Sequence, residues 1–497
     1  MLRWTISWTI IALILSLFPL QDAHTASPST SSKRTLKRDL KRILSRFSAC
    51  SSLSLVVKSK RGMLFDFNGD RTLIPASSLK IVTAIAALSA LGKERRFPSK
   101  LYGHRISAEG VLNGPLFILG GGDPSLGVSS IKGNLGAKEL LGSWCNALKA
   151  RGVKEIRGDI VGLTGLFVDQ SIPRYAIWED LGNYYGGISS ALSFRNNQYE
   201  VILSSPNEPG AAVRLLYTKP EYTGIDTWIN ELSSGAPGSG DNAYIFGTPM
   251  SSKRRLIGTI PPGRRAFTIK GSLPFPGYTC AREFKEVLLK RGIPVRGRAR
   301  RAVSTEPKGF SGSTLLHMHQ SPPLAILLRH MLKKSDNLFA EQILKLLGHH
   351  ILGEGSREAG IRAMKLELKK LKLPLKGMHI KDGSGLSRYN GVSTKFLLRC
   401  LAAAREEDFF QALYESLPVS GVDGSLSRRY ADSVLKTRIR AKTGYMERVF
   451  ALAGYLQTEQ GKQLTFAFIV NNADAPFAIV QRRFSNIARV LVSTKLD

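Results

Sequence analysis

The stretch Pro75-Ala76-Ser77-Ser78-Leu79-Lys80 opens a strongly apolar segment that runs to Gly92. A proline is a helix start signal and a glycine a stop signal, so this pattern predicts a helix from Pro75 to Gly92. On such a helix Ser77 and Lys80, three residues apart, share one face. A lysine whose charged form is disfavoured can take the proton of a serine hydroxyl and make it a nucleophile. The N–H groups at a helix start also suit a developing oxyanion.

The Ser-x-x-Lys pattern is weak by itself, because Ser129 to Lys132 and Ser433 to Lys436 match it too. We expect these two matches to be solvated surface residues. Two further motifs follow in order: Ser335-Asp336-Asn337 starts a helical stretch, and Lys442-Thr443-Gly444 precedes strand-like segments. This order is the three-part signature shared by penicillin-binding proteins and serine β-lactamases. Another match to the middle motif, Ser205-Pro206-Asn207, indicates only a turn.

Each later motif contains groups with a physical role in acyl transfer. Ser335 can relay protons to a leaving group, and Asn337 can hydrogen-bond a substrate amide and hold the lysine of the first motif. Lys442 and Thr443 can bind a substrate carboxylate. Gly444 lets the substrate backbone approach the strand.

With these motifs the sequence resembles the D-alanyl-D-alanine carboxypeptidase and endopeptidase family of low-molecular-mass penicillin-binding proteins, in the branch with a large insertion after the first motif. The resemblance covers most of the chain. Besides the three motifs it is carried by the phrases Gly120-Gly121-Gly122-Asp123-Pro124-Ser125-Leu126, Asp382-Gly383-Ser384-Gly385-Leu386-Ser387-Arg388 and Gly421-Val422-Asp423-Gly424-Ser425-Leu426.

The resemblance implies an α/β (α+β) serine D,D-peptidase/β-lactamase-like fold, with an antiparallel sheet flanked by helices and interrupted by mainly-β inserted domains. The gap between the first and second motifs is far wider than a compact β-lactamase needs. We therefore expect a signal peptide at 1–26, a discontinuous catalytic domain at 27–100 and 301–497, and the insertion at 101–300.

By resemblance, the backbone N–H groups of Ser77 and Tyr445 form the oxyanion hole. Two positions depart from the family's pattern. Tyr445 stands where a small hydroxylated residue is usual. Leu163 stands where an acidic residue often recognises the free amine of the peptide's diamino acid, which leaves that specificity open; Asp159 or Asp169 could substitute for it.

The expected reaction is attack by Ser77 on the penultimate D-Ala carbonyl of a cell-wall stem peptide, followed by hydrolysis of the acyl-enzyme. β-Lactams would acylate the same serine, and the reaction requires neither cofactor nor metal. The sequence does not decide between carboxypeptidase and endopeptidase action. A β-lactamase or esterase on the same scaffold and a non-catalytic polyanion- or wall-binding protein are the alternatives.

The remaining hydrophobic patterns predict a helix-covered antiparallel sheet with strands from both ends of the chain. Expected strands lie at 54–58, 63–67, 449–456 and 464–470, and expected helices at 33–47, 325–333, 338–347 and 478–492.

The N-terminus has the pattern of an export signal. Arg3 precedes a charge-free apolar run from Ile6 to Leu20, and small residues suited to cleavage follow, at Ala23 and Ala26. We expect a periplasmic protein, with an uncleaved N-terminal anchor as the alternative. The chain has four cysteines, and three of them, Cys145, Cys280 and Cys400, lie in helical apolar patterns and are expected to be buried and free.

The charge is unusual: 71 Lys and Arg against 38 Asp and Glu give a net charge of +33. Such an excess favours polyanionic partners. Export makes intracellular nucleic acid an unsuitable partner, which leaves anionic wall polymers or lipid head groups, or solvated charge with no specific partner. The helix at 33–47 is basic and amphipathic, and we expect its apolar stripe to pack on the protein's own sheet.

Overall fold

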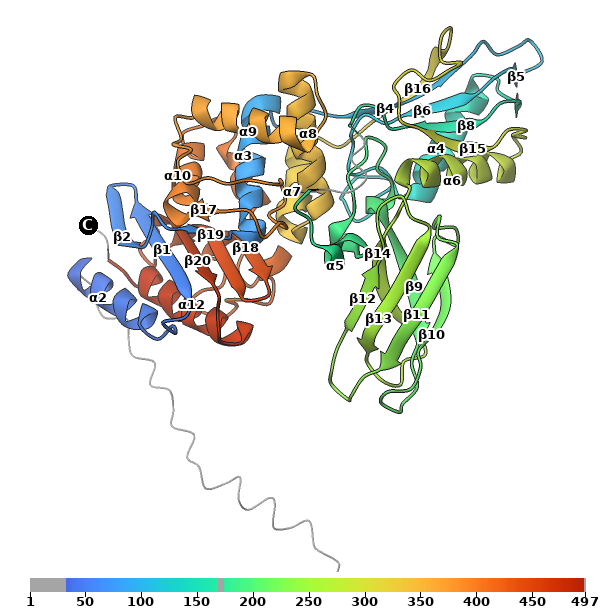
Figure 1. Cartoon of the computed structure of the whole chain (residues 1–497). Helices are drawn as coiled ribbons and strands as arrows, with labels where there is room; N and C mark the ends of the chain where they lie inside the picture. Colours follow the sequence, from blue (N-terminus) through green and yellow to red (C-terminus); the bar gives the residue numbers. More distant parts are fainter. Residues whose placement is uncertain (1–32, 169–173, 496–497) are drawn as a thin grey trace, which may run out of the picture.

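The two ends of the chain meet in one five-stranded antiparallel sheet (Figure 1). The structure is a computed structural model that describes residues 33–168 and 174–495, so the expected signal peptide at 1–26 lies outside it. The strands of this sheet, in spatial order, are β18 (Ile439–Met446), β19 (Val449–Gln457), β20 (Gln463–Asn471), β1 (Ser52–Ser59) and β2 (Gly62–Phe67). This is the helix-covered sheet, built from both termini, that the sequence predicts.

Each face of this sheet buries its own hydrophobic core, because successive strand residues point to opposite sides. In β1, Val56 joins the core on one face, whereas Leu55 and Val57 join the core on the other. The first face is covered by α3 (Lys80–Leu91), α7 (Leu324–Lys334), α8 (Asn337–Leu352), α9 (Arg357–Lys370), α10 (Thr394–Ala404) and α11 (Phe410–Ser416). The second face is covered by α2 (Lys33–Leu44) and α12 (Phe477–Val492).

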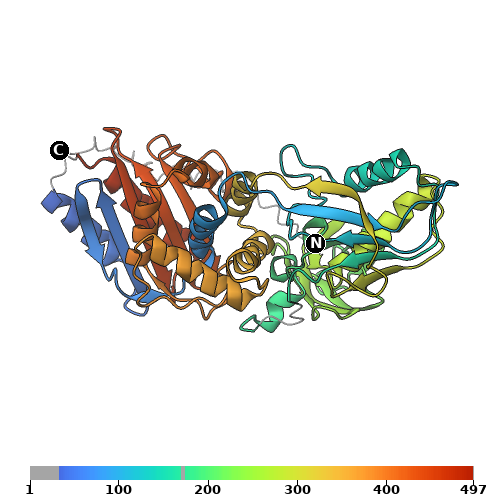
Figure 2. The ribbon, with the colours of Figure 1, turned by 90° about the horizontal axis from the view of Figure 1, so that it is seen from above.

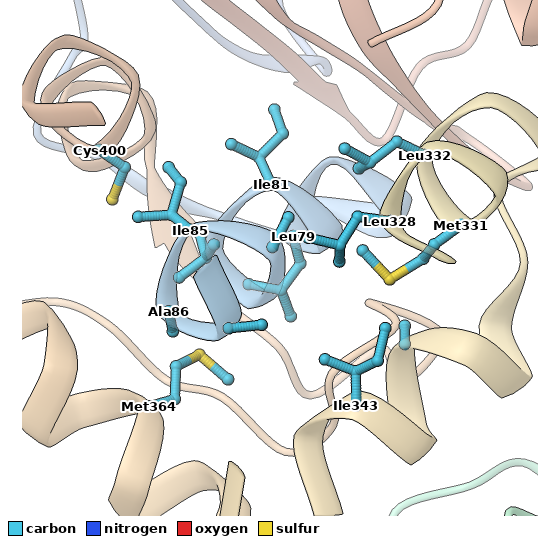
Figure 3. Close-up of a cluster of buried hydrophobic side chains, with 14 of the residues drawn as sticks. Leu79, Ile81, Ile85, Ala86, Leu328, Met331, Leu332, Ile343, Met364 and Cys400 are labelled. Carbon is cyan, nitrogen blue, oxygen red and sulfur yellow. The ribbon is translucent and has the colours of Figure 1, made fainter. Parts of the chain in front are cut away.

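Helix α3 is the centre of the first core. Figure 3 shows Ile81 and Ile85 of this helix surrounded by side chains from the neighbouring helices, among them Ile343 and Met364. The sequence predicts a helix from Pro75, but the structure has a 3-10 turn, η1 (Ala76–Leu79), before the α-helix begins at Lys80. The reason is the backbone of Ala76, whose positive φ of 45° is incompatible with an α-helix.

The inserted segment begins and ends on two paired strands, β4 (Pro98–Gly103) and β16 (Thr314–Gln320). These strands belong to a second five-stranded sheet, which is covered by α4 (Ala137–Ala150) and α6 (Pro276–Lys290). The other strands of this sheet are β6 (Leu116–Leu119), β8 (Ile160–Leu163) and β15 (Ala299–Ala302). The expected boundary at 300/301 falls within β15, so we propose that the inserted part spans 98–320 and the terminal part the remainder.

The inserted part also contains two three-stranded sheets that share one apolar core. Their strands are β9 (Gln198–Ser204), β10 (Arg214–Lys219) and β14 (Phe267–Ser272) in one sheet, and β11 (Thr227–Ser234), β12 (Asn242–Phe246) and β13 (Lys253–Ile260) in the other. Figure 2, seen from above, shows the terminal and inserted parts lying side by side. The inserted part also contains the short elements α5 (Trp178–Leu181), η2 (Tyr184–Gly186) and η3 (Arg195–Asn197), of which η2 contacts α8 of the terminal part.

Several smaller expectations can be compared with the structure. The three cysteines in apolar patterns are buried and free, as predicted, while Cys50 is free and exposed. The serine and lysine of both alternative Ser-x-x-Lys matches are exposed, as predicted. Within residues 33–168 and 174–495 no helix combines the length and the apolar character that crossing a bilayer requires.

The burial of α3 makes a prediction for stability. Ile85 has no exposed surface, so Ile85→Ala should lower the free energy of unfolding by about 2 to 5 kcal/mol, through lost transfer energy and a residual cavity. Urea denaturation measures this. Leu366→Ala, at a side chain of α9 that is 42% exposed, is the control and should change stability by less than about 0.5 kcal/mol. Equal losses in the two variants would contradict the central place given to α3.

Candidate active site

The three sequence motifs meet beside one cleft, where they form two sets of hydrogen bonds, one around Lys80 and one around Lys442. Ser77 lies on η1, Lys80 at the start of α3, Asn337 at the start of α8, and Lys442 on β18. Lys80 Nζ lies 2.9 Å from Ser77 Oγ and 2.6 Å from Asn337 Oδ1. Lys442 Nζ lies 2.9 Å from Ser335 Oγ. All the catalytic side chains expected from sequence therefore lie in one site.

The surroundings of Lys80 make its neutral form more accessible near neutral pH. The side chain is fully buried, which lowers the pKa of its ammonium to about 8 despite nearby carboxylates. Its Nζ also donates to the backbone carbonyl of Ser384, 2.6 Å away. A neutral amine has two N–H donors and one lone pair. In that form the Asn337 and Ser384 oxygens, which can only accept, would take both N–H groups, and the lone pair would be left for the Ser77 hydroxyl proton.

The carbonyl of Ser384 is held in place by a buried ion pair beneath the loop 382–388. Glu341 Oε1 accepts the backbone N–H groups of Gly383 and Ser384, each at 2.9 Å. Its other oxygen, Oε2, pairs with Arg357 at 3.0 Å, and Arg357 lowers the pKa of the Glu341 carboxyl against the effect of burial. The sequence marked this loop as a family-like phrase but did not indicate that its backbone contacts the lysine.

Asp382 closes the same loop on itself. Its two carboxylate oxygens accept from the backbone N–H groups of Gly385 and Ser387, at 2.7 and 2.6 Å. Burial, together with the neighbouring Glu341, raises the pKa of the Asp382 carboxyl to about 6. Glu341 and Asp382 are therefore positioning residues that sequence reasoning missed, because their effect passes through backbone groups.

The conformation of the Ser335-Asp336-Asn337 motif depends on its backbone and on hydrogen bonds from the inserted part. Ser335 ends α7 in the left-handed conformation, with φ 58°, and Asp336 caps α8 by accepting from Phe339 N. Asn337 Nδ2 donates to the carbonyl of Tyr185 at 2.8 Å, and Asn196 Nδ2 donates to Asp336 Oδ2 at 2.8 Å. Both partners come from the inserted part, which therefore helps to fix the orientation of Asn337.

Lys442 is a second fully buried lysine. It donates to Ser335 Oγ and, at 2.6 Å, to the carbonyl of Thr443. Burial lowers its pKa well below the ordinary value, and the nearby Lys80 and Arg429 lower it further. A substrate carboxylate arriving here would restore the ammonium charge, because an anion close by favours the protonated form. Thr443 is held by Ser425, with 2.7 Å between the hydroxyl oxygens.

Gly444 and Tyr445 bring the edge of the sheet against the nucleophile. A Cβ on Gly444 would lie 2.6 Å from the carbonyl oxygen of Pro75, so this glycine is needed for the packing of β18 against η1. The sequence had instead led us to expect that a glycine stands here to let the substrate backbone approach the strand. On the edge of β18 away from β19, the N–H groups of Ile439 and Ala441 donate to Ser420 and Pro418. The alternation of the strand places the N–H groups of Thr443 and Tyr445 on the same edge. The Tyr445 side chain is largely exposed and packs edge-on against Phe477, with 4.7 Å between ring centroids.

Ser77 opens onto a cleft of about 990 Å³ between the terminal and inserted parts. Among the residues that line it are Asp180 and Arg388, which the sequence did not mark as site residues. Burial raises the pKa of the Asp180 carboxyl to about 6, while Arg388 acts in the opposite direction. No motif pointed to Asp180, which lies on the short helix α5 of the inserted part.

The residues considered for amine recognition lie elsewhere or outside the structure. Leu163 is fully buried in β8 against Phe117. Asp159 pairs with Arg300 at 2.8 Å and does not line the cleft. Asp169 lies outside the described residues. Within residues 33–168 and 174–495, no three His, Cys, Asp or Glu side chains are grouped as a metal site would require.

Comparison with known proteins agrees with this geometry. Residues 42–487 match the family described as D-Ala-D-Ala carboxypeptidase 3 (S13). The D-alanyl-D-alanine carboxypeptidase of an Actinomadura species is 27% identical over 440 residues, covering 86% of this chain and 79% of the relative. D-alanyl-D-alanine carboxypeptidase DacB of Haemophilus influenzae is 27% identical over 429 residues, covering 85% of each chain.

A solved structure extends the likeness to the whole fold. The crystal structure of penicillin binding protein 4 from Haemophilus influenzae superposes with a TM-score of 0.78 at 25% identity, and covers 91% of this chain and 98% of its own. The match includes the inserted part as well as the terminal part, since it extends over nine tenths of the sequence. This chain belongs to the D-Ala-D-Ala carboxypeptidase 3 (S13) family of penicillin-binding serine hydrolases.

Proposed function

We propose that this chain removes the terminal D-Ala from cell-wall stem peptides through an acyl-enzyme on Ser77. The observation that carries the proposal is the contact of 2.9 Å between Ser77 Oγ and the Nζ of Lys80, a lysine whose pKa is lowered to about 8. A serine beside a largely desolvated amine is an activated nucleophile. Membership of a family of D-Ala-D-Ala carboxypeptidases supports the same reaction.

In the proposed first step, the substrate lies along β18 with its terminal carboxylate at Lys442 and Thr443. Ser77 Oγ bonds to the penultimate carbonyl carbon as its proton passes to Lys80 Nζ. The carbonyl oxygen becomes an oxyanion that accepts from the backbone N–H groups of Ser77 and Tyr445. Asn337 keeps Lys80 in place and bonds the substrate amide.

In the second step the C–N bond breaks and the leaving amine takes a proton. With its Oγ held by Lys442 Nζ, Ser335 gives its hydroxyl proton to the amine. It receives in exchange the proton that Lys80 took from Ser77, so that Lys80 is neutral again. Water then attacks the ester carbonyl carbon and gives a proton to the neutral Lys80, which returns a proton to Ser77 Oγ as the ester C–O bond breaks. No cofactor takes part in these steps.

We propose that cross-linked peptides are also hydrolysed at this site. A carboxypeptidase has to accommodate only a single D-Ala as leaving group, whereas the cleft beside Ser77 has a volume of about 990 Å³ and two walls, one from each part of the chain. A cleft of this volume can accommodate a leaving group that is itself a peptide. β-Lactams would acylate Ser77 as mimics of the D-Ala-D-Ala terminus.

Labelling with a fluorescent penicillin tests Ser77. Wild type should form a lasting adduct and release D-Ala from a pentapeptide, and Ser77→Ala should do neither. Ser129→Ala, at the exposed serine of the alternative motif, is the matched control and should label as wild type does. Rapid turnover of the drug would indicate a β-lactamase. A well-folded wild type with neither adduct nor D-Ala release would favour a non-catalytic binding protein.

The pKa of Lys80 predicts the pH dependence of acylation. The active form is the neutral amine, whose fraction falls about tenfold for each pH unit below the pKa and is constant well above it. The penicillin acylation rate should therefore rise between pH 6 and a midpoint of about 8. Lys80→Arg, which stays protonated, should slow acylation by about 100-fold or more. A rate independent of pH over this range would contradict the role of Lys80.

We also propose that the protein is exported to the periplasm and contacts anionic polymers or lipid head groups of the envelope. The apolar residues of α2, such as Leu36 and Leu40, are buried in the protein's own core. The helix therefore cannot insert into a bilayer, but its outer face remains cationic. Exposed basic residues on that face are Arg34, Lys37, Arg38, Lys41 and Arg42, with Asp39 as the acidic residue among them.

A charge reversal on α2 tests this contact. Lys37→Glu with Lys41→Glu should weaken retention on isolated sacculi or anionic vesicles at low salt, and wild-type retention should fall at high salt through screening. Lys132→Glu with Lys138→Glu, at exposed positions of the inserted part, removes the same net charge and should have little effect. Equal effects of the two pairs, or retention that does not depend on salt, would contradict a specific role for α2.

A further inference from the structure

Several exposed aromatic side chains line the catalytic cleft or follow its lining residues in the sequence. Of the strongly exposed large apolar residues in the described ranges, three line the cleft, and all three are tyrosines: Tyr184, Tyr244 and Tyr445. Two more stand beside lining residues. Trp178 lies between Ile177 and Glu179 and is 54% exposed, and Tyr389 follows Arg388 and is 64% exposed. We call Trp178, Tyr184, Tyr244, Tyr389 and Tyr445 the aromatic rim.

The rim differs from an ordinary exposed apolar patch in its chemistry. Single exposed apolar residues are common on protein surfaces, but a group of them at one site indicates binding. Every member of the rim carries an O–H or N–H group in addition to its ring, and no aliphatic residue that lines the cleft is strongly exposed. Such rings suit a ligand that is apolar on its faces and polar at its edges.

Three of the rim rings pack against a second aromatic ring. Tyr184 packs edge-on against Tyr185, with 5.3 Å between ring centroids, and Tyr445 packs against Phe477 at 4.7 Å. Tyr389 contacts Tyr175 at 5.5 Å, and Lys381 lies over the Tyr175 ring at 4.4 Å. Restricting the motion of a side chain before binding reduces the entropy that binding costs. These rings are therefore exposed and pre-oriented at once.

The rim spans both parts of the chain. Trp178 on α5, Tyr184 on η2 and Tyr244 on β12 come from the inserted part, whereas Tyr389 and Tyr445 come from the terminal part. Figure 1 places α5 at the junction between the two parts. A ligand that contacts the whole rim would lie across the mouth of the cleft.

The proposed substrate, a stem peptide of peptidoglycan, would bring a sugar strand close to the aromatic rim. In cell-wall peptidoglycan the stem peptide is attached to a sugar strand, and the bond cleaved follows its fourth residue. Four extended residues span at most about 14 Å. With the scissile carbonyl at Ser77, the sugar strand must therefore lie near the cleft mouth. Pyranose rings have C–H faces and hydroxyl edges, which match the exposed Tyr and Trp rings.

We propose that the aromatic rim binds the N-acetylated sugar strand of peptidoglycan, so that the enzyme distinguishes glycan-linked stem peptides from free ones. This inference rests on the proposed function. It adds a carbohydrate subsite to the peptide site, made by rings that take no part in the chemistry at Ser77.

A kinetic comparison of two substrates tests the subsite. D-Ala release is measured on a sugar-free pentapeptide and on the same pentapeptide carried by a disaccharide of N-acetylglucosamine and N-acetylmuramic acid. Trp178→Ala and Tyr389→Ala should each lower kcat/KM on the sugar-linked substrate by roughly threefold to tenfold, the size of one aromatic contact. Both variants should keep wild-type kcat/KM on the free peptide and wild-type penicillin acylation.

Tyr217→Ala is the matched control, because Tyr217 is 51% exposed on β10 and does not line the cleft. It should behave as wild type on both substrates. Equal losses of the rim variants on the two substrates would overturn the proposal and indicate that the rim contacts peptide. Inactivity of wild type on both substrates would instead contradict the proposed function, so the two failures are distinguishable.

Binding of peptide-free sugar gives a second, independent readout. Oligomers of β-1,4-linked N-acetylglucosamine should change the tryptophan emission of the wild-type protein, because Trp178 is far more exposed than the buried Trp144. The change should be absent in Trp178→Phe and present in Tyr217→Ala. An emission change that survives Trp178→Phe, or no change in wild type at millimolar sugar, would overturn the assignment of the rim to sugar.

Discussion

The burial of Lys80 among neutral hydrogen-bond acceptors is the interaction on which the rest of the site depends. A carboxylate in direct contact would hold this lysine in its charged form, and apolar walls alone would leave its N–H groups without partners. Contact with Ser77, Asn337 and the Ser384 carbonyl avoids both outcomes. The lysine keeps its hydrogen bonds and still has a pKa of about 8, which allows it to exchange a proton near neutral pH.

The turn that carries Ser77 is confined by two glycines from distant parts of the sequence. Ala76 has a positive φ, a conformation that costs a non-glycine residue of order 1 to 3 kcal/mol. A Cβ on Gly385 would lie 2.0 Å from the Ala76 carbonyl oxygen, and one on Gly444 would lie 3.1 Å from the Ala76 Cβ. The close approach of both segments holds the strained turn in place. The position of Ser77 is therefore determined by the packing of these two segments as well as by the turn η1 on which it lies.

The inserted part is a structural component of the active site as well as a wall of the cleft. Asn337 is oriented by the Tyr185 carbonyl. One turn further along α8, the buried Gln342 accepts from Ser193 at 2.8 Å and donates to the Gly122 carbonyl at 2.9 Å. These contacts tie the helix that begins with Asn337 to two separate segments of the insertion. A domain inserted between the nucleophile and its partners can therefore influence their geometry directly.

The sequence by itself determined the chemistry and the kind of fold, because both depend on local patterns. Ser77, Lys80, Ser335, Asn337 and Lys442 stand in short motifs, and the apolar strand segments near both termini indicate one sheet. Only the tertiary structure decided what holds these groups. The support from Glu341 and from the carbonyl of Ser384 comes from contacts between segments far apart in sequence. Such contacts leave no pattern in the sequence. Every residue has a backbone carbonyl, so its presence is not informative, and its position depends on how the whole chain packs.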